Sequence, residues 1–271
     1  MRAVPQVMVP SLAVVCLPWS ARAQDAGRRL PDLPVDERYR IEALAGAWAP
    51  GADVIVSSDA QGVPGTRIDL KRDAGLIDQR FPELQLTWRP GLRHKMRIQY
   101  LPIRFDATAT LSRDLVFNGA TYPAGRLVTT HLDWLTYRIG YEYDFIVGRR
   151  AAAGFIAEVK HTRVRAQLLA GAMDEVSRQA MPVPAVGGVL RAYPAARLSL
   201  TGEATFFGVP DRPDGHYGGT VADVDVSGVW TVTRHLGAQF GYRAIDIHHL
   251  GEWNTADFSL MGIYAAARVR Y

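Results

Sequence analysis

The sequence predicts an all-β protein in which antiparallel strands follow one another up and down and close into a barrel. Three observations support this fold class. Large apolar residues recur at every second position along most of the chain, short and long connections alternate between these segments, and no stretch beyond the N-terminal residues has the period of an amphipathic helix. A period of two indicates β-strands because successive side chains of a strand point to opposite faces.

The clearest strand is Leu135 to Val147, where every odd position carries a large apolar or aromatic residue. The even positions include Arg138, Glu142 and Asp144, so one face of this strand is apolar and the other is polar. The same alternation recurs in ten further segments, at residues 39–47, 66–71, 83–89, 95–100, 155–160, 186–192, 198–206, 222–231, 236–244 and 261–271.

The connections between these segments fall into two length classes. Tight turns are expected at residues 89–94, 148–151, 193–196 and 233–235. Longer polar connections are expected at residues 50–65, 112–126, 171–184, 208–219 and 247–255. Such an asymmetry is typical of a barrel whose two ends face different compartments.

Three regions are expected along the chain: residues 1–23 as a cleaved signal peptide, residues 24–37 as a disordered charged leader, and residues 38–271 as the barrel. The first region has Arg2 before an apolar run too short for a spanning helix, and it ends in the small-x-small cleavage pattern of residues 21–23. Cleavage would remove Cys16, the only cysteine, so the mature chain would contain no disulfide.

The charge balance excludes one class of partner. The chain has 31 basic and 27 acidic residues, and removal of Arg2 and Arg22 with the signal peptide leaves 29 against 27. A surplus of two cations is too small for nucleic-acid binding, so no nucleic-acid partner is expected. No pattern in the sequence indicates a cofactor or a metal ion, and we expect neither.

Alternation alone does not decide whether the apolar faces point into a core, as in a soluble lipocalin-like barrel of the periplasm, or outward to lipid. Two features favour lipid. Aromatic residues such as Trp88, Phe145 and Trp230 stand toward strand ends, where membrane barrels have aromatic girdles. An apolar interior within about ten strands would also be hard to fill, since soluble barrels fill best near eight strands.

Strand alternation continues to the final residue, the aromatic Tyr271. In this the chain resembles the broad class of small bacterial outer-membrane β-barrel proteins, in which a terminal aromatic residue belongs to the assembly signal, although Phe is usual there. The resemblance spans essentially the whole mature chain and implies a transmembrane barrel in the outer membrane of a Gram-negative cell envelope. It also implies two partners: lipid or lipopolysaccharide around the barrel, and the barrel-assembly machinery at the C-terminal strand.

Bacterial single-chain barrels have an even number of strands, so the eleven segments must reduce to an even number. We expect the two segments on either side of Asp73 to Pro82 to merge. This gives about ten strands, with eight and twelve as the alternatives.

If the apolar faces meet lipid, the polar faces line the lumen. The lumen-lining residues that we single out are Arg138, Glu142, Asp144, Glu158, Lys160, Glu203, Asp223, Asp225, Arg243 and Arg268. All polar faces together hold twelve cations, Arg40, Arg67, Lys71, Arg89, Lys95, Arg97, Arg138, Lys160, Arg191, Arg243, Arg268 and Arg270, and nine acids, Glu42, Asp69, Glu83, Glu142, Asp144, Glu158, Glu203, Asp223 and Asp225. This mixture lacks the rings of like charge that select ions, and pairs formed across a narrow barrel would close it.

The sequence therefore favours a barrel with a narrow or plugged lumen and a structural or loop-presenting role. A lipid-modifying or hydrolytic enzyme, a small porin-like channel and a periplasmic lipocalin-like barrel are the alternatives. Enzymes on outer-membrane barrels place Ser, His and acidic residues at the outer rim, which makes two groups of residues worth locating. One is the loop group Asp246, His248, His249 and Glu252 with His216 nearby, and the other is His131 with Asp133.

Neither group is assigned a catalytic or metal-binding role. A His beside a carboxylate can act as a base. However, the adjacent His248 and His249 point to opposite sides of an extended chain, and no serine stands in a nucleophile context such as GxSxG. We interpret these residues as loop residues and as the polar rim of a strand that rises out of the membrane.

Overall fold

Ten antiparallel strands close into a barrel in the computed structural model, which describes residues 33–58, 65–171, 173–209, 218–250 and 254–271. The strands are β1 (Ile41–Ser58), β3 (Phe81–Gly91), β4 (His94–Thr110), β7 (Leu127–Val147), β8 (Ala151–Ala170), β9 (Met173–Ala195), β10 (Leu198–Val209), β11 (Gly218–Thr231), β12 (Leu236–Leu250) and β13 (Asn254–Arg270). Each pairs with the next along the chain, and β1 pairs with β13. The predicted all-β, up-and-down, ten-stranded barrel is confirmed. Among the described helices, none has the length and hydropathy to cross a membrane.

The seam between β1 and β13 closes the barrel over seventeen residue pairs. The amide of Tyr271 donates to the carbonyl of Ile41 at 2.8 Å, so pairing extends to the last residue. Gly262 in this seam has no room for a side chain, because a Cβ there would overlap the backbone of Ala49. Close approach of the two strands therefore depends on glycine. The role of Tyr271 in assembly stays a prediction.

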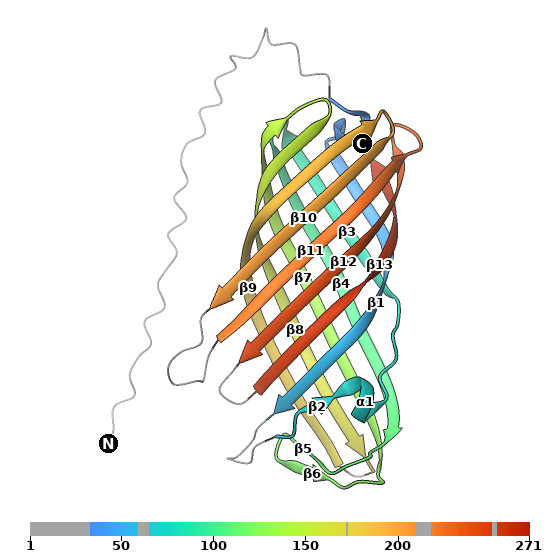
Figure 1. Ribbon diagram of the computed structural model, residues 1–271, viewed down its shortest axis with the longest axis vertical. Helices are drawn as coiled ribbons and strands as arrows, with labels where there is room; N and C mark the ends of the chain where they lie inside the picture. The colour runs from blue at the N-terminus through green and yellow to red at the C-terminus, as the bar shows by residue number, and fades with distance from the viewer. Residues whose placement is uncertain (1–32, 59–64, 172, 210–217, 251–253) are drawn as a thin grey trace, which may run out of the picture. The chain divides into compact units, whose positions relative to one another are not determined.

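The two ends of the barrel differ (Figure 1). One end carries the C-terminus and the tight turns at residues 92–93, 148–150, 196–197 and 232–235. The other end carries β2 (Ile68–Asp69), α1 (Leu70–Ala74) and a separate hairpin of β5 (Leu115–Phe117) and β6 (Ala120–Tyr122). Outer-membrane barrels have short turns on the periplasmic side and longer connections outside. We therefore call the half next to the tight turns the inner half and the half next to α1 the outer half.

The longest strands exceed what a membrane requires. β7, β8 and β9 contain 21, 20 and 23 residues, whereas about 9–11 tilted residues span a bilayer. At about 3.3 Å per residue, β7 is roughly 70 Å long before its tilt is considered. These strands therefore continue well beyond the lipid.

The strand predicted at residues 66–71 is wrong. The chain there forms only the two-residue β2, which pairs with β1, and then turns into α1. The Asp69 side chain accepts hydrogen bonds from the amides of Lys71 and Arg72, and this N-cap starts the helix. The expected merger of two segments is thus also wrong, and the count of ten holds because β2 does not continue around the barrel wall.

The predicted connection at residues 171–184 is wrong as well. β8 and β9 pair as one continuous hairpin up to a turn at Gly171, whose φ is 63°. The outer part of β9 reads MDEVSRQA, without an apolar face, so the alternation that marks a strand is missing. β1 likewise extends into the predicted connection at 50–65, and β5 and β6 occupy the one at 112–126. Parts of the other two long connections, residues 210–217 and 251–253, lie outside the described residues.

The predicted disordered leader is ordered in its last residues. Val35–Glu37 form one turn of 3-10 helix, η1, and the Glu37 side chain is buried. The reason is electrostatic, since this carboxylate has cationic partners at the inner mouth of the barrel. Residues 1–32, which include the predicted signal peptide, lie outside the described residues.

Candidate functional site: the barrel interior

The outward faces of the inner half are apolar. Ile98, Ile139 and Val159 are cross-strand neighbours on β4, β7 and β8, and Ile139 is 59% exposed. Tyr100 and Tyr137 form the next row toward the outer half, with ring centroids 5.3 Å apart. Comparable exposed apolar residues occur on all ten strands. An apolar belt around a whole barrel is a surface for lipid, so the alternative of a soluble lipocalin-like barrel is wrong.

The ten residues predicted to line the lumen occupy inward-facing positions, opposite this belt. They are Arg138, Glu142 and Asp144 of β7, Glu158 and Lys160 of β8, Glu203 of β10, Asp223 and Asp225 of β11, Arg243 of β12 and Arg268 of β13. All ten lie in the inner half. Several of their contacts tie non-neighbouring strands together.

Asp223 is the centre of one ion-pair cluster. Arg138, Lys160 and Arg243 all donate hydrogen bonds to its carboxylate, the last two at 3.0 and 2.8 Å. Arg243 also donates to Glu83 at 3.2 Å. Because β7, which carries Arg138, does not neighbour β11 in the sheet, these side chains meet across the lumen.

A second bridge joins β4 to β10. Arg97 donates two hydrogen bonds to the Glu203 carboxylate, at 2.6 and 3.0 Å. Three strands separate β4 from β10 on one side of the barrel. The pair therefore spans the interior, and its bidentate geometry is the strong form of an arginine–carboxylate contact.

The leader closes the inner mouth through Glu37. Its carboxylate forms ion pairs with Arg89 at 2.7 Å and Lys95 at 3.1 Å, and it accepts a hydrogen bond from the Tyr193 hydroxyl at 2.8 Å. Burial alone would raise the pKa of Glu37, but the surrounding cations, with Lys95 and Arg191 foremost, lower it to about 2. The leader is thus anchored by a carboxylate that stays charged at neutral pH.

The same cluster continues inward. Lys95 lies 3.1 Å from Glu142 and 3.2 Å from Asp144. Arg191 donates two hydrogen bonds to Glu142, at 2.6 and 3.0 Å. Each of these charges has an opposite partner, as burial requires, because an unpaired buried charge is strongly destabilising.

Sequence reasoning missed the two leader acids, Asp36 and Glu37. Asp36 pairs with Arg270 and accepts from the Ser199 hydroxyl at 2.6 Å. The sequence carried no clear signal for them, because a charged leader with prolines is typical of a disordered segment.

Four charges that alternation assigned to the lumen lie elsewhere. Arg40 is exposed at the inner end, and Asp69 caps α1. Arg67 pairs with Asp257 at 2.8 Å and Lys71 with Asp78 at 2.9 Å, all with exposed or half-exposed side chains. Three of the four belong to the segment that forms β2 and α1.

Little open space remains among the lumen charges. A cavity of about 70 Å³ lies between them, lined by Gln85, Arg97, Glu203, Asp225 and Tyr264 among others. Such a volume holds a few water molecules. Tyr264 donates to Asp225 at 3.0 Å and accepts from Gln239 at 2.6 Å, so the cavity lining includes a hydroxyl that is already hydrogen-bonded.

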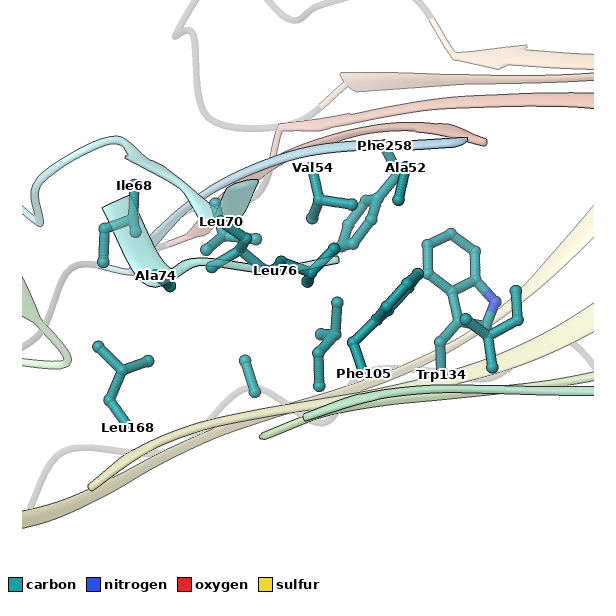
Figure 2. Close-up of a cluster of buried hydrophobic side chains, with 14 of the residues drawn as sticks. Ala52, Val54, Ile68, Leu70, Ala74, Leu76, Phe105, Trp134, Leu168 and Phe258 are labelled. Carbon is teal, nitrogen blue, oxygen red and sulfur yellow. The ribbon is translucent and has the colours of Figure 1, made fainter. Parts of the chain in front are cut away.

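The interior of the outer half is apolar (Figure 2). Trp134 of β7 meets Phe258 of β13 edge to face, with ring centroids 4.6 Å apart, although these strands are not neighbours. Phe105 packs in the same way against Phe81 at 5.0 Å. Figure 2 shows side chains of β2 and α1, such as Leu70, within this cluster. A packed apolar core therefore crosses the barrel above the charged lumen.

The candidate catalytic groups lie on the outward wall of the outer half. His131 bonds to Asp106 at 2.5 Å and not to Asp133, which pairs with Arg104 at 2.6 Å. His248 pairs with Asp257. The exposed fractions of these side chains range from 32% for Asp257 to 75% for Arg104. In the described part of the chain, no serine hydroxyl forms a hydrogen bond with either histidine.

The remaining members of these groups add no site. Asp246 is exposed on β12, two residues before His248. His216 and Glu252 lie outside the described residues, as does the side chain of His249. The described residues contain no group of three or more His, Cys, Asp or Glu side chains that could hold a metal ion.

No protein-family model matches the sequence, and no curated protein sequence matches it either. Solved structures do. The crystal structure of the outer membrane protease OmpT from Escherichia coli matches with a TM-score of 0.55 at 8% identity, covering 91% of this chain and 99% of that one. The translocator domain of the autotransporter NalP from Neisseria meningitidis matches with a TM-score of 0.45 at 6% identity, covering 86% and 89%. Neisserial surface protein A matches with a TM-score of 0.37 at 13% identity, covering 85% and 97%.

The chain thus has the fold of bacterial outer-membrane β-barrel proteins, which confirms the resemblance inferred from the sequence. Its apolar belt is the surface by which such a barrel spans a membrane. Closed bacterial barrels of this kind belong to the outer membrane, and the protein is placed there.

Proposed function

We propose that this protein is a sealed outer-membrane barrel whose outer half serves as a rigid platform for binding at the cell surface. One observation carries the proposal: two different fillings occupy the interior in series, ion pairs in the inner half and an apolar core in the outer half. A channel needs neither, and a platform is stiffened by both.

The charge distribution argues against ion selection. Asp223 faces three cations, and Arg97 faces Glu203 in a bidentate pair, so carboxylates and cations neutralise one another locally. A selective pore needs a ring of one sign. Leaving these pairs unmade would be costly in a low-dielectric interior, which favours a closed lumen.

The construction of the outer end supports the platform. Asp73 of α1 pairs with Arg113 at 2.6 Å, and burial, which alone would raise the pKa of Asp73, is outweighed by hydrogen bonds from Arg113 and Arg72 that lower it. At the tip of the β5–β6 hairpin, Asn118 and Gly119 have φ values of 50° and 82°, as a tight two-residue turn requires. Binding residues are commonly carried on loops that a rigid scaffold positions.

Planar-bilayer recording tests the seal. The wild-type protein should give no steps, or small and weakly selective ones. The double variant Arg97→Ala/Glu203→Ala removes the mid-lumen bridge but leaves the outer-half core, so it should also conduct little. Large, stable porin-like steps from the wild type would overturn the proposal, and large steps from the double variant would show that the apolar core is no seal.

Surface labelling of intact cells tests the platform. A short epitope inserted between Asn118 and Gly119 should be reached by antibody from outside while the barrel still shows heat-modifiable migration on gels. The same epitope in the turn at residues 148–150 is the matched control and should be reached only after permeabilisation. The reverse pattern of labelling would contradict the orientation and the proposal.

A further inference from the structure

On the outward wall of the outer half, the side chains change from apolar to charged next to the apolar belt. On β4 and β7, the outward rows run from Tyr100 and Tyr137 to Pro102 and Leu135. The row after these is charged. Aromatic side chains mark the level of lipid headgroups in membrane barrels, so the charged row stands where phosphate groups of the outer leaflet lie.

Four neighbouring strands contribute to that charged row. Arg104 of β4 pairs in register with Asp133 of β7, Asp133 with Arg165 of β8, and Arg165 with Arg178 of β9. Arg163 of β8 stands one row nearer the belt, opposite Leu135. At about 4.8 Å per strand, the row is about 14 Å long.

These arginines surround a groove. An open depression of about 840 Å³ on the barrel wall is lined by five arginines, Arg80, Arg104, Arg163, Arg165 and Arg178. We call it the arginine groove. Its acidic lining residues are Asp106 and Asp133, so the cations outnumber the acids. All five arginine side chains are exposed.

Most of the cations in the arginine groove lack an acidic partner. Arg104 pairs with Asp133 at 2.6 Å. Arg163 donates to the ring of His161 at 3.3 Å, and Arg165 donates to the Gln167 side-chain oxygen at 3.1 Å. In the described residues, no carboxylate lies within salt-bridge distance of Arg80, Arg163, Arg165 or Arg178. The interior of the same protein pairs its cations closely, so the contrast points to a ligand outside the chain.

The opposite wall has the opposite charge. At a comparable distance beyond the belt on β1, β12 and β13, the outward residues are Asp53, Asp246 and Asp257, and Arg67 neutralises only the last. An anion approaching the barrel from the outer leaflet would therefore be attracted to the face of β4, β7, β8 and β9 and repelled from this one.

We propose that the arginine groove binds the phosphate headgroup of an anionic lipid of the outer leaflet. Guanidinium groups bind phosphate bidentately, and exposed arginines pay no desolvation penalty before the ligand arrives. Pro102 and Leu135 adjoin the arginines and lead to the apolar belt, so acyl chains attached to the phosphate would lie on lipid-facing residues. This amphipathic layout selects a lipid over free phosphate, which could use only the arginines.

Native mass spectrometry of the full chain in neutral detergent tests the proposal. The probes are phosphatidic acid, phosphatidylcholine with the same acyl chains, and inorganic phosphate. We expect phosphatidic acid to bind at least about tenfold more tightly than either of the others. In the variant Arg163→Gln/Arg165→Gln, that preference should fall by about tenfold or more, because two charge-assisted contacts are lost.

The matched control is Arg67→Gln/Arg234→Gln, which removes two exposed cations away from the arginine groove. It should bind like the wild type, and both variants should keep heat-modifiable migration. Equal loss in the two double variants would mean non-specific charge attraction and would overturn the proposal. So would equal affinity for phosphatidic acid and phosphatidylcholine, or competition by inorganic phosphate at the same concentration as the lipid.

Discussion

The inner and outer halves of β7 carry opposite side-chain patterns on one uninterrupted strand. In the inner half Ile139 points outward and Arg138 inward, whereas in the outer half His131 points outward and Leu132 inward. The phase of the strand does not change between them. What changes is the medium outside the wall, from lipid to water, and the filling inside changes with it.

Alternation therefore identifies the two faces of a strand but not which face is core. Below the aromatic row the barrel is built like a membrane protein, with charges inside that must all be paired. Above it the same wall is built like a soluble protein, with Phe105 and Trp134 in a dry core. Four substitutions test how far this division holds.

The largest effect is expected in the outer-half core. Phe105 is 1% exposed and packs on Phe81, so Phe105→Ala should cost about 3–5 kcal/mol of unfolding free energy. The adjacent Asp106→Ala, on the outward face, should change it by about 0.5 kcal/mol or less. Urea unfolding of the refolded barrel measures both. Similar losses for the two variants would mean that the outer half has no soluble-type core.

The next effect concerns the outward faces. Ile139→Arg puts a cation into lipid and should cost about 2–4 kcal/mol, as measured by the same unfolding assay. His131→Arg puts the same side chain on the same face of β7 in the outer half and should cost at most about 1 kcal/mol. Equal tolerance at the two positions would erase the division between the halves.

The third prediction uses pH at the inner mouth. A carboxyl whose folded pKa lies below its unfolded value stabilises the protein above the unfolded pKa, and this is lost as pH falls through the folded value. For Glu37 the pKa falls from 4.5 to about 2. It should therefore contribute about 3 kcal/mol that disappears progressively below pH about 4.5. Glu37→Gln should flatten this part of the stability curve, and an unchanged curve would argue against an anchored leader.

The smallest effect is expected where the two fillings meet. A Cβ at Gly241 would overlap the ring of Tyr264, so Gly241→Ala should cost about 1–3 kcal/mol by displacing that ring from its lumen partners. Gly202 is the control, because a Cβ there meets nothing within 4 Å. Unfolding free energies that change equally in the two variants would show that the Tyr264 position is not constrained.

The local features of this protein could be predicted from neighbouring residues in the sequence. Residues 135–147 already identified the strand and its two faces, because successive side chains of a strand point to opposite sides. The direction of the apolar face required further observations, namely the aromatic residues near strand ends and the number of strands. The mixed charge of the lumen could also be predicted, since each charged residue stands on the polar face of its own segment. The outer part of β9 was not, because beyond the lipid neither face of that stretch is apolar.

The contacts between residues distant in the sequence could not be predicted in this way. Closure of the barrel brings Arg138, Lys160 and Arg243 to Asp223. It also brings Arg89 to Glu37, which anchors a leader expected to be disordered. The arginine groove has the same origin, because its members are spread over residues 80–178 and share a face only through strand register. The interaction energy of two charges depends on the distance between them in the folded protein, and their spacing in the sequence does not give that distance.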